Sequence, residues 1–394
     1  MNNYKLEELC EFIRNGASIK QFENAKGYPI TRIETIADSY INLERVGYAD
    51  IIDLSKYEDY LLNIGDILMS HINSEKHLGK TAIFENEDKK LIHGMNLLCI
   101  RPDKKLVSPK YLNYYFKSLA FKKQLPKITK KSVNQASFSV SDLKKLKCKI
   151  HSIESQKKIV KILDKSQELI DKRKKQIEKL DLLVKSKFIE MFGDPVTNLK
   201  KWDKVAIGEM FEIKTGATPS RKENSYWEGG TIPWVKTTEL KEYIINETEE
   251  YITEDGFNNS SVNLLPKDTI LIAMYGQGKT RGMTGKLGIE ATTNQACAAI
   301  LPNNNENMDF VWYQLRLLYD ELRALGQGGS QPNLNTNLVK TYQLIFPPVE
   351  LQNEFERFIK HIDKLKFELE KSLKELEDNF NSLMQKAFKG ELFN

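Results

Sequence analysis

The segment SVNQASFSVSDL, residues 132–143, decides how the chain is organised, because a second version of it follows about 196 residues later. The second version is GGSQPNLNTNL, residues 328–338, in which Gln331 corresponds to Gln135. Each copy is followed by a Glu-x-Gln triplet, at 154–156 and 350–352, and then by a long charged helical pattern. Repeats of solenoid proteins are about 20–50 residues long. The longer period therefore predicts two globular domains, each followed by one helix.

Weaker sequence similarities extend toward the N-terminal part of each copy. Asn15-Gly16 resembles Thr215-Gly216, and Gly79-Lys80 is aligned with Gly285-Lys286. A chain of 394 residues can hold two domains of roughly 150 residues with helical connectors. The sequence predicts a first globular domain at 1–152, a first spacer helix at 153–192, a linker at 193–200, a second globular domain at 201–348, and a second spacer helix with a C-terminal tail at 349–394.

Composition places the chain among ordinary globular proteins. Apolar residues make up 40% and charged residues 29%, the N-terminus has no signal-peptide pattern, and no apolar run approaches the ~20 residues that span a bilayer. Cys10, Cys99, Cys148 and Cys297 are scattered, without CxxC spacing. We expect a cytoplasmic protein with reduced, partly buried cysteines and no membrane contact.

Positive charge is concentrated in one segment, although the net charge is only +5. Residues 117–149 contain ten lysines and one acidic residue, Asp142. Lysine runs are often solvated surface, and that alternative stays open for any single run. A one-sided excess beside hydroxyl and amide groups such as those of Thr129 and Gln135 suits contact with phosphate. The sequence thus predicts a basic face on an otherwise mixed surface.

Both helical patterns carry apolar residues at seven-residue intervals, which is typical of a coiled coil. A helix of about 38 residues, at about 1.5 Å per residue, would be roughly 57 Å long. Antiparallel pairing of two such helices would place one globular domain at each end, related by a pseudo-twofold axis. Packing of each helix only on its own domain is the alternative. The residues expected to pair are Leu163, Ile170, Ile177, Val184, Phe355, Ile362, Leu369, Leu376 and Leu383.

Short strand-like runs separated by Gly, Asn and Pro predict an α+β fold with a curved antiparallel sheet in each globular domain. Helical spacing is found at 109–120 and 309–325. Two polar, partly basic loops, 71–77 and 275–282, follow buried strands, where a reader of DNA base edges would be placed. Trp234, in a Gly-rich stretch, is expected to anchor a loop by packing.

Together these motifs resemble the specificity subunit of type I restriction–modification systems. The resemblance covers the two-copy layout, FIEMFGDP at 188–195, the Thr-Pro-Ser to Ile-Pro-Trp stretch at 218–234, GSQP at 329–332 and FKGEL at 388–392. The first domain lacks the Thr-Pro-Ser and Trp markers. Two domains that recognise different DNA sequences are expected to differ in this way.

The resemblance implies two target-recognition domains, each reading one half of a bipartite, asymmetric DNA sequence, and two paired helices that set the spacing. It implies a non-catalytic targeting subunit whose partners are double-stranded DNA, two methyltransferase subunits that methylate adenine and, in the restricting complex, motor–nuclease subunits. S-adenosylmethionine would be bound by the methyltransferase subunits, and this chain would carry no cofactor and no metal.

The residues expected to contact DNA lie in the two polar loops, in 127–137, in 327–335 and around the Thr-Pro-Ser stretch. They are His71, Asn73, Lys76, His77, Lys127, Thr129, Lys130, Lys131, Asn134, Gln135, Ser220, Arg221, Lys236, Tyr275, Gln277, Lys279, Arg281, Gln327, Ser330, Gln331 and Asn333.

None of the catalytic motifs considered is complete. The segment at 276–280 lacks the first glycine of a nucleotide-binding loop, since that position is Ala273. Residues 346–349 lack the flanking residues of an adenine methyltransferase loop, and the five histidines are dispersed. Two alternatives remain: a self-contained nuclease or methyltransferase with duplicated domains, and a coiled-coil scaffold that binds only protein.

Overall fold

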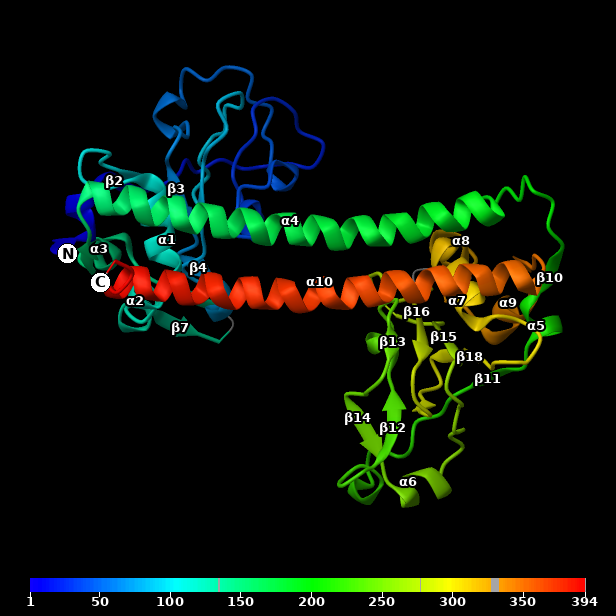
Figure 1. The fold of residues 1–394 in the computed structure, drawn as a ribbon. Helices are drawn as coiled ribbons and strands as arrows, with labels where there is room; N and C mark the ends of the chain where they lie inside the picture. Colours follow the sequence, from blue (N-terminus) through cyan, green and yellow to red (C-terminus); the bar gives the residue numbers. More distant parts are fainter. Residues whose placement is uncertain (134, 277, 327–332, 394) are drawn as a thin grey trace. The chain divides into compact units, whose positions relative to one another are not determined.

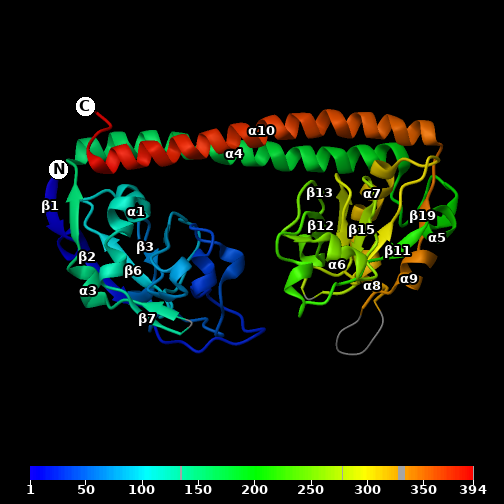
Figure 2. The ribbon, with the colours of Figure 1, turned by 90° about the horizontal axis from the view of Figure 1, so that it is seen from below.

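The computed structural model of the protein describes residues 1–133, 135–276, 278–326 and 333–393. It divides into two compact units: unit 1 comprises Met1–Lys174 and Lys371–Asn394, and unit 2 comprises Lys175–Glu370. Two long helices, α4 (Ile153–Phe192) and α10 (Val349–Lys389), each contribute residues to both units (Figure 1). Sheets and helices are combined in each unit, so the expected α+β class is confirmed (Figure 2).

Unit 1 is built around an antiparallel four-stranded sheet with the strand order β2-β6-β3-β5. A smaller sheet has the order β4-β8-β7, and β1 pairs with β9. The elements are β1 (Asn2–Lys5), β2 (Cys10–Asn15), β3 (Ile67–Met69), β4 (Ile72–Asn73), β5 (Thr81–Ile83), β6 (Leu98–Pro102), α1 (Pro109–Lys117), α2 (Leu119–Lys122), β7 (Lys130–Ser132), β8 (Gln135–Ser137), α3 (Val140–Lys144) and β9 (Lys147–Ile150).

Unit 2 has a five-stranded sheet of order β11-β18-β15-β16-β13, in which only the edge pair β13–β16 is parallel. A three-stranded sheet, β14-β12-β17, lies with α6 in the part of unit 2 farthest from α10 (Figure 1). The elements are β10 (Lys204–Ala206), α5 (Ile207–Met210), β11 (Ile213–Thr215), β12 (Ile232–Val235), β13 (Ile244–Ile245), β14 (Glu250–Ile252), α6 (Glu254–Asn258), β15 (Ile270–Ala273), β16 (Thr284–Leu287), β17 (Thr292–Thr293), β18 (Cys297–Ile300), α7 (Met308–Leu317), α8 (Tyr319–Ala324), α9 (Thr336–Thr341) and β19 (Gln343–Ile345).

The central sheets of the two units repeat one another strand by strand. Ile67 of β3 pairs with β6 and β5, and Ile270 of β15 pairs with β18 and β16 in the same way. This equivalence corrects one sequence alignment. Gly79 donates to the Ser70 carbonyl as Gly282 donates to the Ala273 carbonyl, so Gly79 corresponds to Gly282 and not to Gly285. Both glycines have positive φ, +74° and +83°, which favours glycine.

A second pair of glycines explains another echo of the repeat. A Cβ on Gly16 would lie 2.3 Å from the His93 carbonyl oxygen, and one on Gly216 would lie 1.9 Å from the Thr293 carbonyl oxygen. The next residue in each copy, Ala17 or Ala217, donates its N–H to that same carbonyl. Close backbone contact therefore requires glycine at both positions.

Within each unit the two long helices run antiparallel. In unit 1, Leu163 of α4 shares a core with Met384 and Phe388 near the end of α10. In unit 2, the ring of Phe188, near the end of α4, lies 5.4 Å from that of Phe355, near the start of α10. The helices also pack on the globular part of each unit, because α1 contributes to the core of unit 1 and α7 to the core of unit 2.

The residues expected to pair differ in burial along the helices. Leu163, Ile170, Val184, Phe355 and Ile362 are buried. Half-buried residues occupy the other heptad positions: Ile177, Leu369, Leu376 and Leu383. Where two helices pack only on each other, they bury a narrower stripe of side chains than where they also pack on a domain.

Both segments with helical spacing are divided in two. The segment 109–120 spans α1 and the start of α2, with Ser118 between them in an extended conformation. The segment 309–325 forms α7 and α8, with Leu318 at the junction in a non-helical conformation. The four cysteines are free thiols, of which three are buried and Cys10 is half-buried. Among the described residues, no helix is long and apolar enough to cross a membrane.

Candidate nucleic-acid interface

The small sheet of unit 1 brings together two segments that the sequence singled out separately. Strand β4 lies in the loop 71–77, and it pairs with β8 of the lysine-rich segment, with Asn73 opposite Ala136. Strands β8 and β7 form a hairpin in which Lys131 lies opposite Ala136. The predicted base-reading loop and the predicted phosphate-contacting segment therefore form one surface.

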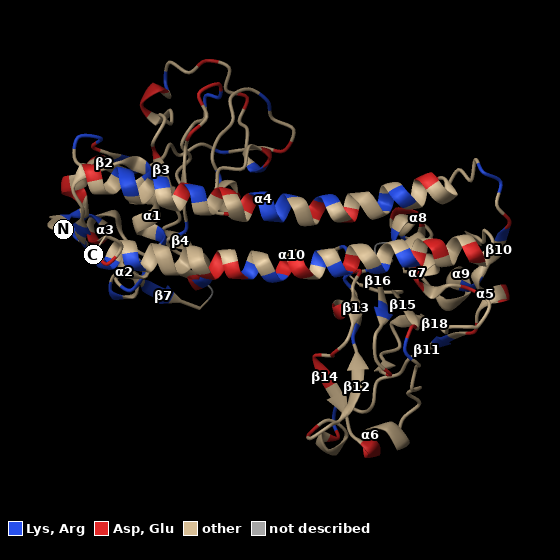
Figure 3. Cartoon of the chain, viewed as in Figure 1, with Lys and Arg blue, Asp and Glu red and all other residues tan. Residues whose placement is uncertain are grey.

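The described residues near the end of this hairpin are exposed. Lys130, Lys131 and Gln135 are exposed, and the Val133 side chain is 98% exposed. Lys131 forms an ion pair with Glu75 of the neighbouring loop, N to O 2.7 Å. Lys and Arg gather around β7 and α2 in Figure 3. An exposed basic hairpin of two strands has dimensions that the major groove of DNA admits.

His71 does not lie on this surface as the sequence suggested. Its side chain is only 6% exposed, and burial lowers the pKa of its imidazole. Lys117, at the edge of the lysine-rich segment, is also withdrawn, since its ammonium donates to the Ser39 carbonyl and burial lowers its pKa. The side chains of His71 and Lys117 would both have to change conformation to contact DNA.

The remaining expected residues of unit 1 lie beside the hairpin. Lys76 and Lys127 are exposed, and His77 is half-buried. Asn73 and Thr129 are engaged locally, with Asn73 bonded to Ser70 and Thr129 to the Leu125 carbonyl. Asn134 lies outside the described residues.

In unit 2 the loop between β15 and β16, residues 274–283, is held by helix α8. The Tyr319 hydroxyl donates to the Lys279 carbonyl at 2.7 Å, and Arg323 Nη1 donates to the Arg281 carbonyl at 3.2 Å. Arg323 Nη1 also donates to the Tyr319 oxygen at 3.2 Å. These bonds hold the backbone at Lys279 and Arg281 and leave the Lys279 side chain exposed.

A second expected segment meets the base of this loop. The Leu334 N–H donates to the Met274 carbonyl at 3.0 Å, which places the exposed Asn333 next to the loop. Tyr275 is 40% exposed and Arg281 is half-buried. Gln277, Gln327, Ser330 and Gln331 lie outside the described residues.

Arg221, in the Thr-Pro-Ser stretch, forms an aromatic cluster with the two tryptophans. Its guanidinium carbon lies 3.6 Å from the ring centroid of Trp227 and 4.9 Å from that of Trp234. Trp234 is 2% exposed and donates its indole N–H to the Ala217 carbonyl, as a loop anchor would. Arg221 also pairs with Glu250 at 2.6 Å.

Two glutamates neutralise most of the positive charge near this cluster. Lys236 pairs with Glu249 at 2.9 Å and with Glu250 at 2.8 Å. Burial alone would raise the pKa of Glu250, but hydrogen bonds from Lys236 and Arg221 hold it below its ordinary value. Arg221 and Lys236 therefore anchor the loop that contains the exposed Ser220, and their role as phosphate contacts stays a prediction.

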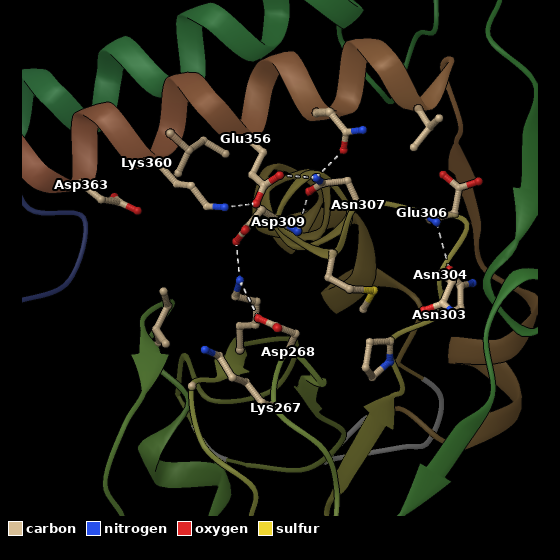
Figure 4. A pocket seen from close by; sticks show the side chains of 18 of the residues that line it. Lys267, Asp268, Asn303, Asn304, Glu306, Asn307, Asp309, Glu356, Lys360 and Asp363 are labelled. Carbon is tan, nitrogen blue, oxygen red and sulfur yellow. Dashed lines mark hydrogen bonds and ion pairs between the residues drawn. The ribbon is translucent and has the colours of Figure 1, made fainter.

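A polar cavity of about 620 Å³ separates the central sheet of unit 2 from α10 (Figure 4). Lys286, only 5% exposed, pairs there with Asp268 and Asp309. Asn307 donates to Asn353 at 2.9 Å and to Glu356 at 2.8 Å. These polar groups form ion pairs and hydrogen bonds with one another. The bonds from Asn307, at the start of α7, to Asn353 and Glu356 join α7 to α10. Among the described residues, no group of three or more His, Cys, Asp or Glu residues could hold a metal ion.

Sequence reasoning missed Tyr319 and Arg323. Their spacing of four residues is that of any helix surface, and nothing in the pattern links α8 to a loop about forty residues earlier. The buried Lys286 was also missed, because its acidic partners are distant in sequence.

The fold defines a class: a duplicated α+β protein whose two units share two long helices. The family model described as type I restriction modification DNA specificity domain matches residues 1–181 and 199–378. The chain therefore belongs to this family, as the resemblance suggested.

Relatives with curated names agree with this assignment. The chain is 33% identical over 381 residues to the putative type I restriction enzyme MjaX specificity subunit of Methanocaldococcus jannaschii, covering 92% of this chain and 86% of that protein. It is 26% identical over 220 residues to the type I restriction enzyme EcoR124I/EcoR124II specificity subunit of Escherichia coli, covering 54% and 52%.

Two solved structures share the fold. One, described as "Structural basis underlying complex assembly and conformational transition of the type I R-M system", matches with a TM-score of 0.60 at 16% identity over 99% of this chain and 98% of that chain. The type I restriction-modification system S subunit from M. genitalium matches with a TM-score of 0.54 at 17% identity, covering 98% and 96%.

Proposed function

We propose that the chain is the non-catalytic specificity subunit of a type I restriction–modification complex, with unit 1 and unit 2 each reading one half of a bipartite DNA sequence. The duplication carries this proposal. Each unit has the same central strand order and a polar loop beyond the buried strand β3 or β15. Two related readers with different side chains suit an asymmetric target.

The DNA contacts are divided between backbone and base edges. The exposed Lys127 and Lys130 of unit 1 and Lys279 of unit 2 are suited to phosphate. Gln135 and Arg281 carry the amide and guanidinium groups that pair with adenine and guanine edges in the major groove. Asn73, Tyr275 and Asn333, which flank these residues, complete the proposed surfaces.

The long helices set the distance between the half-sites. Both α4 and α10 are continuous across the boundary between the residues of unit 1 and those of unit 2. Ion pairs link the helices on both sides of that boundary: Lys174 with Glu377 at 2.8 Å in unit 1, and Lys366 with Asp181 at 2.7 Å in unit 2. A paired helix resists bending, so the spacing of half-sites should be constant.

The reaction belongs to partner subunits. Two methyltransferase subunits dock on the helices, bind S-adenosylmethionine and methylate adenine, and motor–nuclease subunits join in the restricting complex. The adenine leaves the base stack to enter a methyltransferase pocket, because modifying enzymes cannot reach a base inside a duplex.

The test is a genome-wide methylation map made with this chain and its methyltransferase partner. We expect a split motif with constant spacing. A short continuous motif would contradict the proposal, and methylation by the isolated chain would favour a self-contained enzyme instead.

Variants in each unit should separate the half-sites. Arg281→Ala, in unit 2, should relax the bases of one half, and Lys130→Ala, in unit 1, should weaken binding without relaxing either half. Relaxation of both halves by Arg281→Ala would undo the assignment of one unit to one half-site.

A further inference from the structure

The proposed DNA contacts do not account for the Glu-x-Gln triplet near the start of each long helix. Its glutamines, Gln156 of α4 and Gln352 of α10, are 0% and 1% exposed. A buried amide must be hydrogen-bonded, because an unsatisfied polar group in a protein interior is costly. Their partners therefore indicate what the repeated glutamine does.

In unit 1, Gln156 bonds to two other segments. Its Oε1 accepts from the N–H of Ser108, the residue at the N-cap position of α1, at 2.8 Å. Its Nε2 donates to the His151 carbonyl at 2.9 Å, in the linker between β9 and α4, and to the Leu106 carbonyl at 3.2 Å. One side chain thus ties the start of α4 to its own linker and to the start of α1.

In unit 2, Gln352 makes the equivalent set of bonds. Its Oε1 accepts from the N–H of Asn307, the residue that caps α7, at 3.1 Å. Its Nε2 donates to the Pro347 carbonyl at 2.8 Å, in the linker between β19 and α10, and to Glu306 Oε2 at 2.6 Å. The same three parts are joined in both units, although the residues around the glutamine differ.

We propose that Gln156 and Gln352 are positioning residues that fix the angle between the globular part of each unit and the long helix that follows it in the chain, and thereby make the half-site spacing strict. The proposal rests on the proposed function. The linkers, 151–152 and 346–348, are the short segments about which the globular part of a unit would turn relative to the helix that follows it.

The geometry of DNA explains why this angle matters. Each added base pair moves a half-site by about 3.4 Å and turns it by roughly 35° around the duplex, since one turn takes about 10–10.5 base pairs. A unit could follow a displaced half-site only by rotating about its linker. Bonds that hold the linker and the caps of α1 and α7 oppose that rotation.

The test uses Gln352→Met, which keeps the length of the side chain and removes its hydrogen bonds. The variant, assembled with the methyltransferase partner, is assayed on duplexes that carry both native half-sites with a spacer of native length, one base pair shorter or one longer. We expect methylation of the mis-spaced duplexes, relative to the native one, to rise about tenfold, which corresponds to about 1.4 kcal/mol. Recognition of each half-site should be unchanged.

Gln314→Met is the matched control. Gln314 is 0% exposed in the same unit, and it donates to the Ile345 carbonyl at 3.0 Å and accepts from the Ile345 N–H at 2.8 Å. These bonds tie α7 to β19 and do not include α10. An equal loosening by Gln314→Met would show that general destabilisation is the cause and would overturn the proposal.

Other outcomes are also decisive. An unchanged spacer preference in a folded Gln352→Met complex would overturn the proposal. If that variant does not fold, Gln156→Met in unit 1 carries the same expectation. A wild-type complex that shows no preference for a fixed spacer would instead reject the proposed function itself, before any variant is compared.

Discussion

Replacement of Phe188 by alanine should strongly destabilise unit 2, because this side chain joins the two long helices. Phe188 is fully buried, and its ring lies 5.4 Å from that of Phe355 on α10 and 5.5 Å from that of Phe310 on α7. Truncation of a fully buried phenylalanine costs about 3–5 kcal/mol. We expect the upper part of this range, since the rings of two other elements would lose their partner.

Tryptophan fluorescence during guanidinium denaturation measures this loss in unit 2 alone. All four tryptophans of the chain, Trp202, Trp227, Trp234 and Trp312, belong to its residues. Phe121→Ala, which removes an equally buried ring from unit 1, is the matched control. It should shift the fluorescence transition less than Phe188→Ala does.

A double-mutant cycle between Phe188 and Phe355 then tests the contact between the helices. Aromatic pairs in contact couple by about 0.5–1.5 kcal/mol. Phe188 with Phe211, which is buried in the same core and packs its ring against Phe346, should be additive within about 0.5 kcal/mol. Additivity of Phe188→Ala with Phe355→Ala would refute the pairing of α4 with α10 in unit 2.

Three further perturbations test the recognition surfaces and the core of unit 1. Lys130→Ala should make the slope of log affinity against log salt shallower by about 0.9, as the loss of one phosphate contact does, and an unchanged slope would remove Lys130 from the interface. Tyr319→Phe should weaken binding at the half-site of unit 2 about fivefold, because the hydrogen bond to the Lys279 carbonyl is lost. Tyr251→Phe, which changes an exposed tyrosine of β14, is the control and should have no effect. Equal effects of the two substitutions would reject the role of Tyr319. Burial lowers the pKa of His93 to about 4, whereas an unfolded imidazole titrates near about 6.5. The unfolded chain therefore takes up a proton first as pH falls, and unit 1 should lose about 3 kcal/mol of unfolding free energy between pH 7 and pH 4. A pH series of denaturation curves measures this loss, and a His93→Gln variant with the same pH dependence would contradict the assignment.

Features with a regular period could be predicted from the sequence. The heptads at Leu163 and Phe355 gave the two long helices, because a stripe of apolar residues on a helix needs a partner. The repeat gave two similar units, since each copy must build its own core. The offset of 196 residues also identified Gln156 and Gln352, although not their bonds.

Features that depend on partners distant in sequence could not be predicted. Arg221 and Lys236 suggested phosphate contacts, but Glu250 at the start of β14 pairs with both, and Glu249 pairs with Lys236. His71 follows a buried strand and could have faced either way, and only the packing of Phe138 against it shows that it is covered. The alignment of Gly79 failed because two glycines follow each other closely in the second copy, and backbone pairing alone distinguishes them.

The limits of the globular domains also depend on tertiary structure. Compact unit 1 includes the end of α10, and compact unit 2 includes the end of α4. Segment limits drawn along the sequence, such as 1–152 and 201–348, cannot express this exchange of helices, and they stay a prediction about local structure.

The most direct test of a helix-set spacing is to lengthen both helices by three heptads. Twenty-one residues would be inserted after Lys174 in α4 and after Glu370 in α10, between the two ion pairs that link the helices. Three heptads add about 31.5 Å of helix, or about nine base pairs of DNA at about 3.4 Å each, which is close to one turn of the duplex and returns the half-site to nearly the same face. The methylation map should then show the same two half-sites with a spacer about nine base pairs longer. An unchanged spacer, or altered half-sites with the original spacer, would contradict the role proposed for α4 and α10.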